Sequence, residues 1–265
     1  MSAPFAIDMF GAKGSWRLIP LIYTALLILL GILTWIFVPR QDRTPGQAKP
    51  LADMLEPLKE MRVWRFSLYY VVVFGAYVAL SSVLPTYYSD AYGVPLTAQA
   101  LLTASYIFPA SLLRPVGGWA SDRWGARRVM YLTFGLMLVL CGILIVPGLP
   151  LALFATVVFL VGCAMGIGKA AVYKHIPEYY PTNVGSVGGL VGMLGGLGGF
   201  FLPPLFYYVK AATGMQTATF LVLFLITLIS AIWMHLTIVR MKRQGIDTHE
   251  HAIDHSHIHR DPQEA

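Results

Sequence analysis

The chain has 265 residues, of which 57% are hydrophobic and 12% charged, and its mean hydropathy is +0.65. Soluble domains carry about 25% charged residues, so this composition excludes a water-soluble enzyme, a disordered protein and a fibrous protein. In so apolar a chain the net charge of +6 indicates basic loops on one side of a bilayer, and not nucleic-acid binding. The sequence therefore predicts an all-α integral membrane protein.

Seven apolar stretches are long enough to cross the hydrocarbon core, which takes about 20 helical residues. They are residues 17–38, 65–88, 97–119, 129–148, 151–173, 185–209 and 217–240. The segment 1–16 lacks the features of a signal peptide. A polar linker, 39–64, divides a lone helix at 17–38 from a six-helix bundle at 65–241. A tail at 242–265 is rich in histidine, and we expect it to be disordered.

Basic residues alternate between the connections, which predicts an orientation. The linker 39–64 carries five Lys and Arg residues and the connection 120–128 carries three arginines, whereas 89–96 and 146–150 carry none. The positive-inside rule places the basic connections, the 174–184 loop and the C-terminus in the cytoplasm. Residues 1–16 would then lie outside, although Lys13 and Arg17 oppose that placement. We expect a multi-pass protein of the cytoplasmic membrane.

Arg114 lies inside the third predicted span. It precedes Asp122, at the expected cytoplasmic boundary, by eight residues, which is about 12 Å of helix. A guanidinium at that depth is costly unless an anion, carbonyl groups or water surround it. Either its side chain extends toward the cytoplasm, or it binds an anion inside the bundle. Pro115 restricts the backbone directly after it, and the predicted span holds no carboxylate to neutralise it.

The connection after this span combines glycines, an acid and several bases at the membrane boundary. From Gly118 through Arg127 it fits the pattern G-x-x-x-D-R-x-G-x-R. It resembles the cytoplasmic loop of the major facilitator superfamily, which follows the second helix of each six-helix half. The resemblance implies a gate and a structural latch, without substrate contact, formed by Gly118, Asp122, Arg123, Gly125 and Arg127.

The sixth predicted span has eight glycines in the fifteen residues 185–199. Several recur every three or four residues and share one helical face: Gly188, Gly189, Gly192, Gly195, Gly196 and Gly199. Such a face permits close helix packing or dimerisation, and it also lets backbone approach a small ligand. With the preceding stretches 165–170 and 174–181, it resembles the nitrate signature of the nitrate/nitrite porter family. The resemblance covers residues 16–240 and matches helices six to twelve of that family, so a partial major facilitator fold is expected.

Individual residues follow from this resemblance. Arg114 matches the substrate arginine of the second half. Tyr70 and Phe74 match the aromatic residues beside the anion, although apolar packing is their alternative role. Gly198 matches the glycine that approaches the substrate. Lys169, in a Gly-Lys-Ala setting, resembles the subgroup thought to couple to protons; the alternative is a side chain that extends to the membrane surface.

The resemblance implies secondary active transport of nitrate or nitrite by alternating access, in a proton symporter that serves nitrate assimilation. Helices one to five of the family are absent from the sequence, so we expect the chain to need an N-terminal half and not to transport alone. Two alternatives stay open: a major facilitator carrier of another small anion, and a seven-helix receptor or sensor.

We expect no enzyme activity and no cofactor or structural metal. The sequence shows no nucleophilic triad, no paired catalytic carboxylates and no phosphate-binding loop. The tail histidines have spacings that suit a transition metal, but such tails are usually solvated. They are His249, His251, His255, His257 and His259.

Overall fold

The computed structural model describes residues 15–37 and 50–243, and these residues form helices and turns without any strand. The histidines of the tail and most of the segment 1–16 lie outside the described residues. In chain order the helices are α2 (Ser15–Phe37), α3 (Leu51–Leu55), α4 (Met61–Tyr70), α5 (Ala76–Tyr92), α6 (Leu96–Leu112), α7 (Arg114–Trp124), α8 (Ala126–Ile145), α9 (Leu151–Tyr179), α10 (Val184–Thr213) and α11 (Ala218–Arg243). A 3₁₀ turn (Glu56–Lys59) precedes α4, and a π-helical turn (Val71–Gly75) joins α4 to α5.

Among the described residues six helical segments are long and apolar enough to cross a membrane, and the bent pair α6–α7 makes a seventh. The all-α membrane fold predicted from composition is therefore confirmed. The bounds differ from those expected: the second span extends over Met61–Tyr92 and the fifth over Leu151–Tyr179. Backbone groups have no water to bind in the hydrocarbon core, so even the glycine-rich residues of α10 stay helical there.

The third span is not the continuous helix that we expected over 97–119. It bends by 40° at Leu113, between α6 and α7. Proline lacks a backbone N–H and its ring crowds the preceding turn, and Pro109 and Pro115 stand on either side of the bend. Arg114 is therefore the first residue of α7 and does not lie inside a continuous helix.

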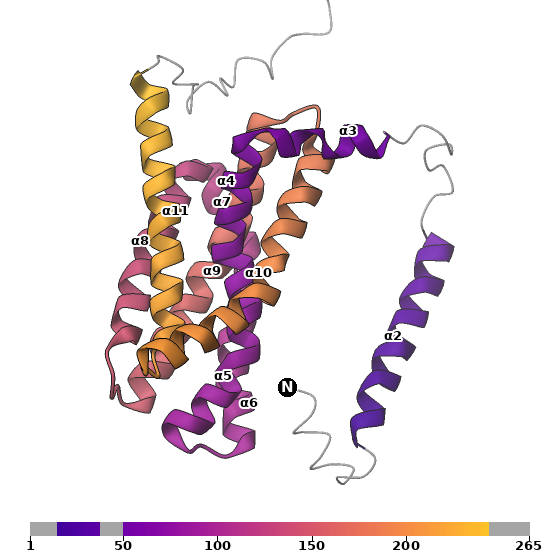
Figure 1. Ribbon diagram of the computed structural model, residues 1–265. Helices are drawn as coiled ribbons and strands as arrows, with labels where there is room; N and C mark the ends of the chain where they lie inside the picture. Colours follow the sequence, from indigo (N-terminus) through magenta and orange to yellow (C-terminus); the bar gives the residue numbers. More distant parts are fainter. Residues whose placement is uncertain (1–14, 38–49, 244–265) are drawn as a thin grey trace, which may run out of the picture.

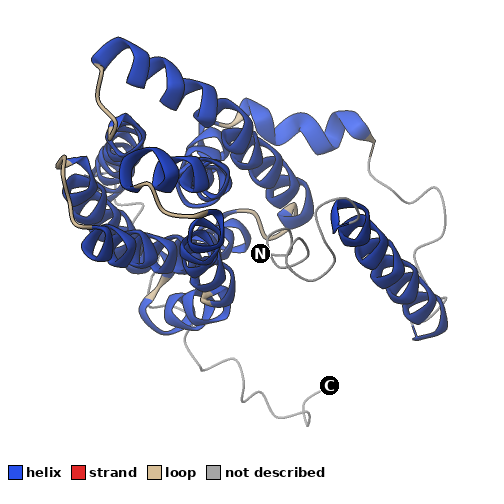
Figure 2. Ribbon diagram, turned by 90° about the horizontal axis from the view of Figure 1, so that it is seen from below, coloured by secondary structure: helices blue, strands red, loops and turns tan. Residues whose placement is uncertain are grey.

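The six spans after α2 pack into one bundle, in which α9 contacts α6, α7 and α8 while α10 crosses α4, the π turn and α5 (Figure 1). Helix α2 stands apart from this bundle in both ribbon views (Figure 2), and its apolar side chains are exposed from residue 20 to residue 37.

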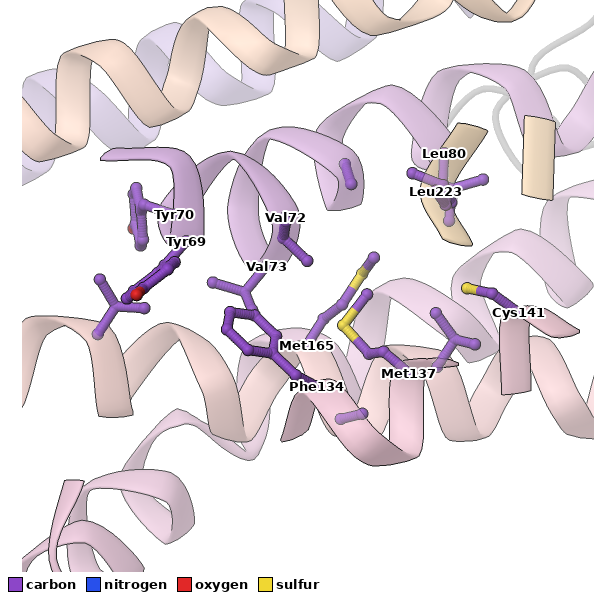
Figure 3. Close-up of a cluster of buried hydrophobic side chains, with 14 of the residues drawn as sticks. Tyr69, Tyr70, Val72, Val73, Leu80, Phe134, Met137, Cys141, Met165 and Leu223 are labelled. Carbon is purple, nitrogen blue, oxygen red and sulfur yellow. The ribbon is translucent and has the colours of Figure 1, made fainter. Parts of the chain in front are cut away.

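The bundle core is apolar and aromatic. In Figure 3, Val73 of the π turn and Tyr69 of α4 lie beside Phe134 of α8.

The two ends of the bundle differ in charge. One end, which we call the basic end, gathers the start of α4, the α7–α8 and α9–α10 connections and the end of α11 (Figure 1). Its cations among the described residues are Lys59, Arg62, Arg65, Arg123, Arg127, Arg128, Lys174, Arg240, Lys242 and Arg243. The opposite end carries the ion pair of Lys210 with Asp90, at 3.9 Å, and the hydrogen bond from the Tyr92 hydroxyl to the Leu149 carbonyl, at 3.0 Å. The basic connections, which alternate with the others along the chain, thus lie at one end of the bundle, as the sequence predicts.

Candidate functional site

An aromatic row occupies one face of the second span, on both sides of the π turn. The rings of Tyr70 and Phe74 are stacked with centroids 4.9 Å apart, and Phe74 is stacked in turn on Tyr77 at 6.4 Å. A π turn adds one residue per turn relative to an α-helix, and such turns are frequent at functional sites. The structure thus brings the two predicted aromatic residues together, and adds Tyr77, which the sequence analysis did not single out.

Arg114 faces the start of this row. Its Nη2 atom donates a hydrogen bond to the Tyr70 hydroxyl at 3.5 Å, and its side chain is otherwise exposed. One turn earlier, on α6, the Ser111 hydroxyl lies 3.2 Å from that of Tyr77. The guanidinium is directed along the bundle face beside Tyr70 and keeps donors free for an anion. We call Tyr70, Phe74, Tyr77, Ser111 and Arg114 the central site.

Lys169 of α9 is buried beside the central site, with 2% of its surface exposed. Its Nζ atom donates to the Ala110 carbonyl at 3.0 Å and lies 3.2 Å from the centroid of the Tyr77 ring. The alternative of a side chain extended to the membrane surface is therefore wrong. It rested on a span that ended at residue 173, whereas α9 continues to Tyr179 and places the lysine deeper.

Part of the glycine face of α10 packs directly under the central site. A methyl group added at Gly195 would collide with the Tyr70 ring, and one at Gly199 would lie 2.7 Å from Val78. Gly198 packs against Gly75, where an added methyl group would lie 3.0 Å from the Gly75 Cα. Gly198 is buried in this helix contact, and its nearest neighbours are Gly75 and Val71.

Other glycines of α10 face a second aromatic residue, Tyr173 of α9. Its hydroxyl donates to the Gly188 carbonyl at 3.2 Å and would lie 2.6 Å from a methyl group at Gly192. Its ring packs edge-on against Tyr70, with centroids 5.0 Å apart. Gly196 lies beside Phe74, while Gly189 faces open space. Tyr173 was missed because tyrosine in an apolar helix has no sequence feature that separates a site residue from a packing residue.

The predicted loop residues lie at the basic end, away from the central site. Asp122 forms an ion pair with Lys174 of α9, and Arg127 donates to the Tyr179 hydroxyl at 3.4 Å. Gly125 has φ +86°, a conformation that glycine adopts readily, and it allows the sharp turn between α7 and α8. Arg123 lies over the Trp119 ring at 5.6 Å.

The close helix contact expected of this loop comes from a neighbouring glycine. Gly117 packs against the backbone of Ile167, 2.7 Å from its Cα for an added methyl group, whereas Gly118 has open space around it. The helix contact therefore belongs to Gly117, which precedes the loop pattern by one residue.

A further hydrogen bond joins the connection before α4 to the end of α9. The Tyr180 hydroxyl donates to the Glu60 carboxylate at 2.6 Å. Burial and this carboxylate raise the pKa of Tyr180, so the phenol keeps the proton that it donates. Together with the Asp122–Lys174 pair, this bond connects α4, α7 and α9 at the basic end.

The family model of the Major Facilitator Superfamily matches residues 66–261. The chain belongs to the major facilitator superfamily. The partial major facilitator fold is confirmed, because the match begins within α4 and takes in every later span of the bundle. The superfamily consists of multi-pass membrane carriers, which agrees with the spans of the bundle.

Three curated relatives indicate which family within the superfamily the chain resembles. The chain is 58% identical over 249 residues to the probable nitrate/nitrite antiporter NarK1 of Thermus thermophilus, and 30% identical over 234 residues to the nitrite extrusion protein of Bacillus subtilis. It is 37% identical over 161 residues to the probable nitrate/nitrite transporter NarK2 of Mycobacterium tuberculosis. These similarities confirm the recognition of the nitrate/nitrite porter family.

Each match covers a larger share of this chain than of the relative. They take in 87%, 87% and 60% of this chain, respectively, but 56%, 59% and 40% of those three relatives. The chain thus spans about half the length of the curated relatives it matches.

Proposed function

We propose that this chain forms the C-terminal half of a carrier for nitrate and nitrite, and that the central site binds the anion. The observation that carries the proposal is the exposed Arg114 guanidinium, hydrogen-bonded to Tyr70 beside a row of stacked aromatic rings. The relatives named as nitrate and nitrite transporters or antiporters support the choice of anion.

The chemistry of the central site suits a small, flat oxyanion. A guanidinium offers a planar fork of N–H donors that pairs with two oxygens at once, which a lysine ammonium does not. The Tyr70 ring, held against α10 by Gly195, keeps the hydroxyl in place beside Arg114. The faces of Phe74 and Tyr77 form an apolar wall that a weakly hydrated anion tolerates.

Lys169 is the proposed coupling residue. Its only polar partner among the described residues is the Ala110 carbonyl, one turn before Arg114, so its charge has no carboxylate to hold it in place. Gain and loss of a proton here would accompany anion binding and make the carrier a symporter. The Thermus relative is named an antiporter, which makes nitrate/nitrite exchange the alternative. An imposed pH gradient drives uptake in the first case and not in the second.

In the proposed carrier the basic end and the C-terminus lie in the cytoplasm, as the positive-inside rule predicts. The bend between α6 and α7 lies between the central site and the loop at the basic end, so rocking of α7 would link the anion to the ion pair of Asp122 with Lys174. A carrier of this kind moves its substrate between two halves, and we propose that these 265 residues bind anion but need a second half for transport.

Binding and transport test the proposal separately. Isothermal titration of the purified chain with sodium nitrate should detect binding, and Arg114→Lys should weaken it about tenfold or more, because one bidentate contact is lost. Arg128→Lys, an exposed change at the basic end, is the matched control. Unchanged affinity in Arg114→Lys would contradict the assignment of the site.

The transport arm uses vesicles. Vesicles that contain only this polypeptide should not accumulate nitrate, and robust uptake would disprove the need for a second half. Competition by other small anions separates a nitrate carrier from a carrier of a different anion. Binding without flux in a full-length relative would favour a receptor or sensor.

A further inference from the structure

A second tyrosine–arginine pair lies on the other side of α4. Tyr69 is adjacent in sequence to Tyr70, but successive helical residues point about 100° apart. The Tyr69 ring therefore packs edge-on against Phe134 of α8, with centroids 5.4 Å apart, and not against the glycine face of α10 (Figure 3). On the same side, one turn earlier, stands Arg65.

These two residues line a small pocket at the basic end, with a volume of about 20 Å³. Its walls come from α4, α8, α9 and α11. The polar lining residues are Arg65, Tyr69, Arg127, His175, Tyr179 and Thr237. Arg127 is the second residue of α8 and Tyr179 the last of α9, so the mouth of the pocket lies at the ends of the helices.

One polar group in this pocket is deeply buried without a hydrogen-bond partner among the described residues, and a second, largely buried one also lacks a partner there. The Tyr69 side chain is 3% exposed, and its hydroxyl has no partner. Arg65 is 9% exposed, and its guanidinium contacts the Phe66 ring at 5.4 Å without forming a hydrogen bond or ion pair within the described part of the chain. A buried unpaired hydroxyl costs free energy, and the largely buried cation beside it favours a ligand that accepts hydrogen bonds and carries negative charge.

The surroundings determine the charge of that ligand. No carboxylate of the described residues lines the pocket, and two acids at this end are engaged elsewhere, Glu60 with Tyr180 and Asp122 with Lys174. His175 is held through Nδ1 by the Ala171 carbonyl at 2.8 Å and carries no negative charge in either protonation state. Arg127 adds a second positive charge near the mouth. The pocket offers donors and positive charge, which an acceptor-rich anion satisfies.

We infer that this pocket binds an oxyanion, at a site separate from the central site. Its volume holds one water-sized group, so one oxygen of the anion would enter between Arg65 and Tyr69 while the rest stays at the mouth beside Arg127. A free inorganic anion and the phosphate of an anionic lipid share this chemistry. Basic pockets between membrane helices on the cytoplasmic side bind such head groups.

The test uses the full 265-residue chain with Arg114→Gln, which removes the arginine of the central site. In a neutral detergent, sodium phosphate and sodium nitrate are titrated at constant ionic strength while thermal unfolding and binding heat are measured. In nanodiscs, phosphatidylcholine is compared with phosphatidylcholine that contains phosphatidylglycerol. Binding in detergent identifies a free anion, and stabilisation only by phosphatidylglycerol identifies a lipid phosphate; either result supports the site.

Variants of the pocket residues show whether the measured binding occurs in this pocket. Adding Tyr69→Phe should weaken the response about fivefold, because one hydrogen bond is lost. The same change should leave the anion-free chain as stable as before or more so, because the hydroxyl has no partner. Adding Arg65→Gln should abolish the response, whereas Tyr70→Phe should not change it. The inference is overturned if neither probe binds, or if Tyr69→Phe lowers the unfolding temperature without changing the response, as expected for a hydroxyl that holds only a structural water.

Discussion

The central site and the basic-end pocket each use a tyrosine of α4, Tyr70 and Tyr69. The arginine beside each tyrosine differs in its exposure to solvent. At the central site the Arg114 guanidinium is exposed and has a hydroxyl partner, Tyr70. In the basic-end pocket Arg65 is largely buried, and the hydroxyl beside it, that of Tyr69, has no partner among the described residues. An exposed arginine can gain and lose an anion repeatedly, as a carrier requires. A buried one is better suited to holding a ligand continuously.

Backbone geometry explains how one helix serves both sites. The π turn after Tyr70 keeps Phe74 stacked on it, and Gly75 in that turn lets α10 approach to contact. The other side of α4 has no such glycine contact and packs on the large side chains of α8 and α11. The central site therefore depends on small residues, and the basic-end pocket on bulky ones.

The largest effect should come from Gly195→Ala. The added methyl group would collide with the Tyr70 ring, which is buried and cannot move aside without disturbing α10. Overpacking of this kind costs about 1–3 kcal/mol of unfolding free energy, and nitrate affinity at the central site should fall with it. Chemical denaturation and nitrate titration measure the two effects.

Gly189→Ala is the matched control, because nothing lies within 4 Å of its added methyl group. It should be neutral or slightly stabilising in an α-helix. Equal behaviour of the two variants would mean that the glycine face does not position Tyr70.

Lys169→Met should have the next largest effect, and in the stabilising direction. Methionine fills the space of the lysine stem without a buried charge, so the free energy of unfolding should rise by about 1–3 kcal/mol. In a full-length relative with the same lysine, nitrate uptake should stop responding to an imposed pH gradient. Lys174→Met, which removes a half-exposed ion pair, is the control and should not stabilise. A destabilised Lys169→Met protein would show that the contacts with Ala110 and Tyr77 hold the bundle together.

The sequence predicted the spans, and the grouping of Arg114 with Tyr70 and Phe74, better than the detailed geometry. Apolar runs were enough to find seven spans, but the bend at Leu113 was missed, because Pro109 and Pro115 are also tolerated in straighter membrane helices. The π turn after Tyr70 has no sequence marker at all. The pairing of Tyr70 with Arg114 followed from the family resemblance, since the two residues are 44 positions apart.

The basic-end pocket escaped sequence analysis for a related reason. The second span was expected to begin at residue 65, which made Arg65 a boundary cation, whereas α4 begins at Met61 and carries Arg65 into the bundle. An error of one helical turn at a span boundary thus changes an ordinary surface arginine into a buried one. Lys169 was misplaced by the same kind of error at the end of α9.

Tyr70→Phe separates the two sites more finely. Loss of the hydroxyl removes one hydrogen bond to Arg114, so nitrate affinity at the central site should fall up to about tenfold. The stacked ring remains, so stability should change little. Titration with nitrate in the presence of wild-type Arg114 measures the effect, and Tyr69→Phe is the control, since its hydroxyl faces the other pocket. A loss of nitrate affinity at the central site in Tyr69→Phe would mean that one connected site, and not two, responds to the anion.

The smallest effect should come from Asp122→Asn, because its ion pair with Lys174 is partly exposed to solvent on both sides, at 59% and 42% of the side-chain surface. Exposed pairs contribute about 0–1 kcal/mol and weaken with salt, so the unfolding temperature should fall slightly at low ionic strength and not at high. Asp90→Asn, which breaks the looser pair with Lys210 at the opposite end, should change it even less. A loss that persists in high salt would mean that Asp122 supports the basic end by more than its ion pair. If anion binding at the central site also changed, the bend between α6 and α7 would be transmitting that change, and the two regions would be mechanically coupled.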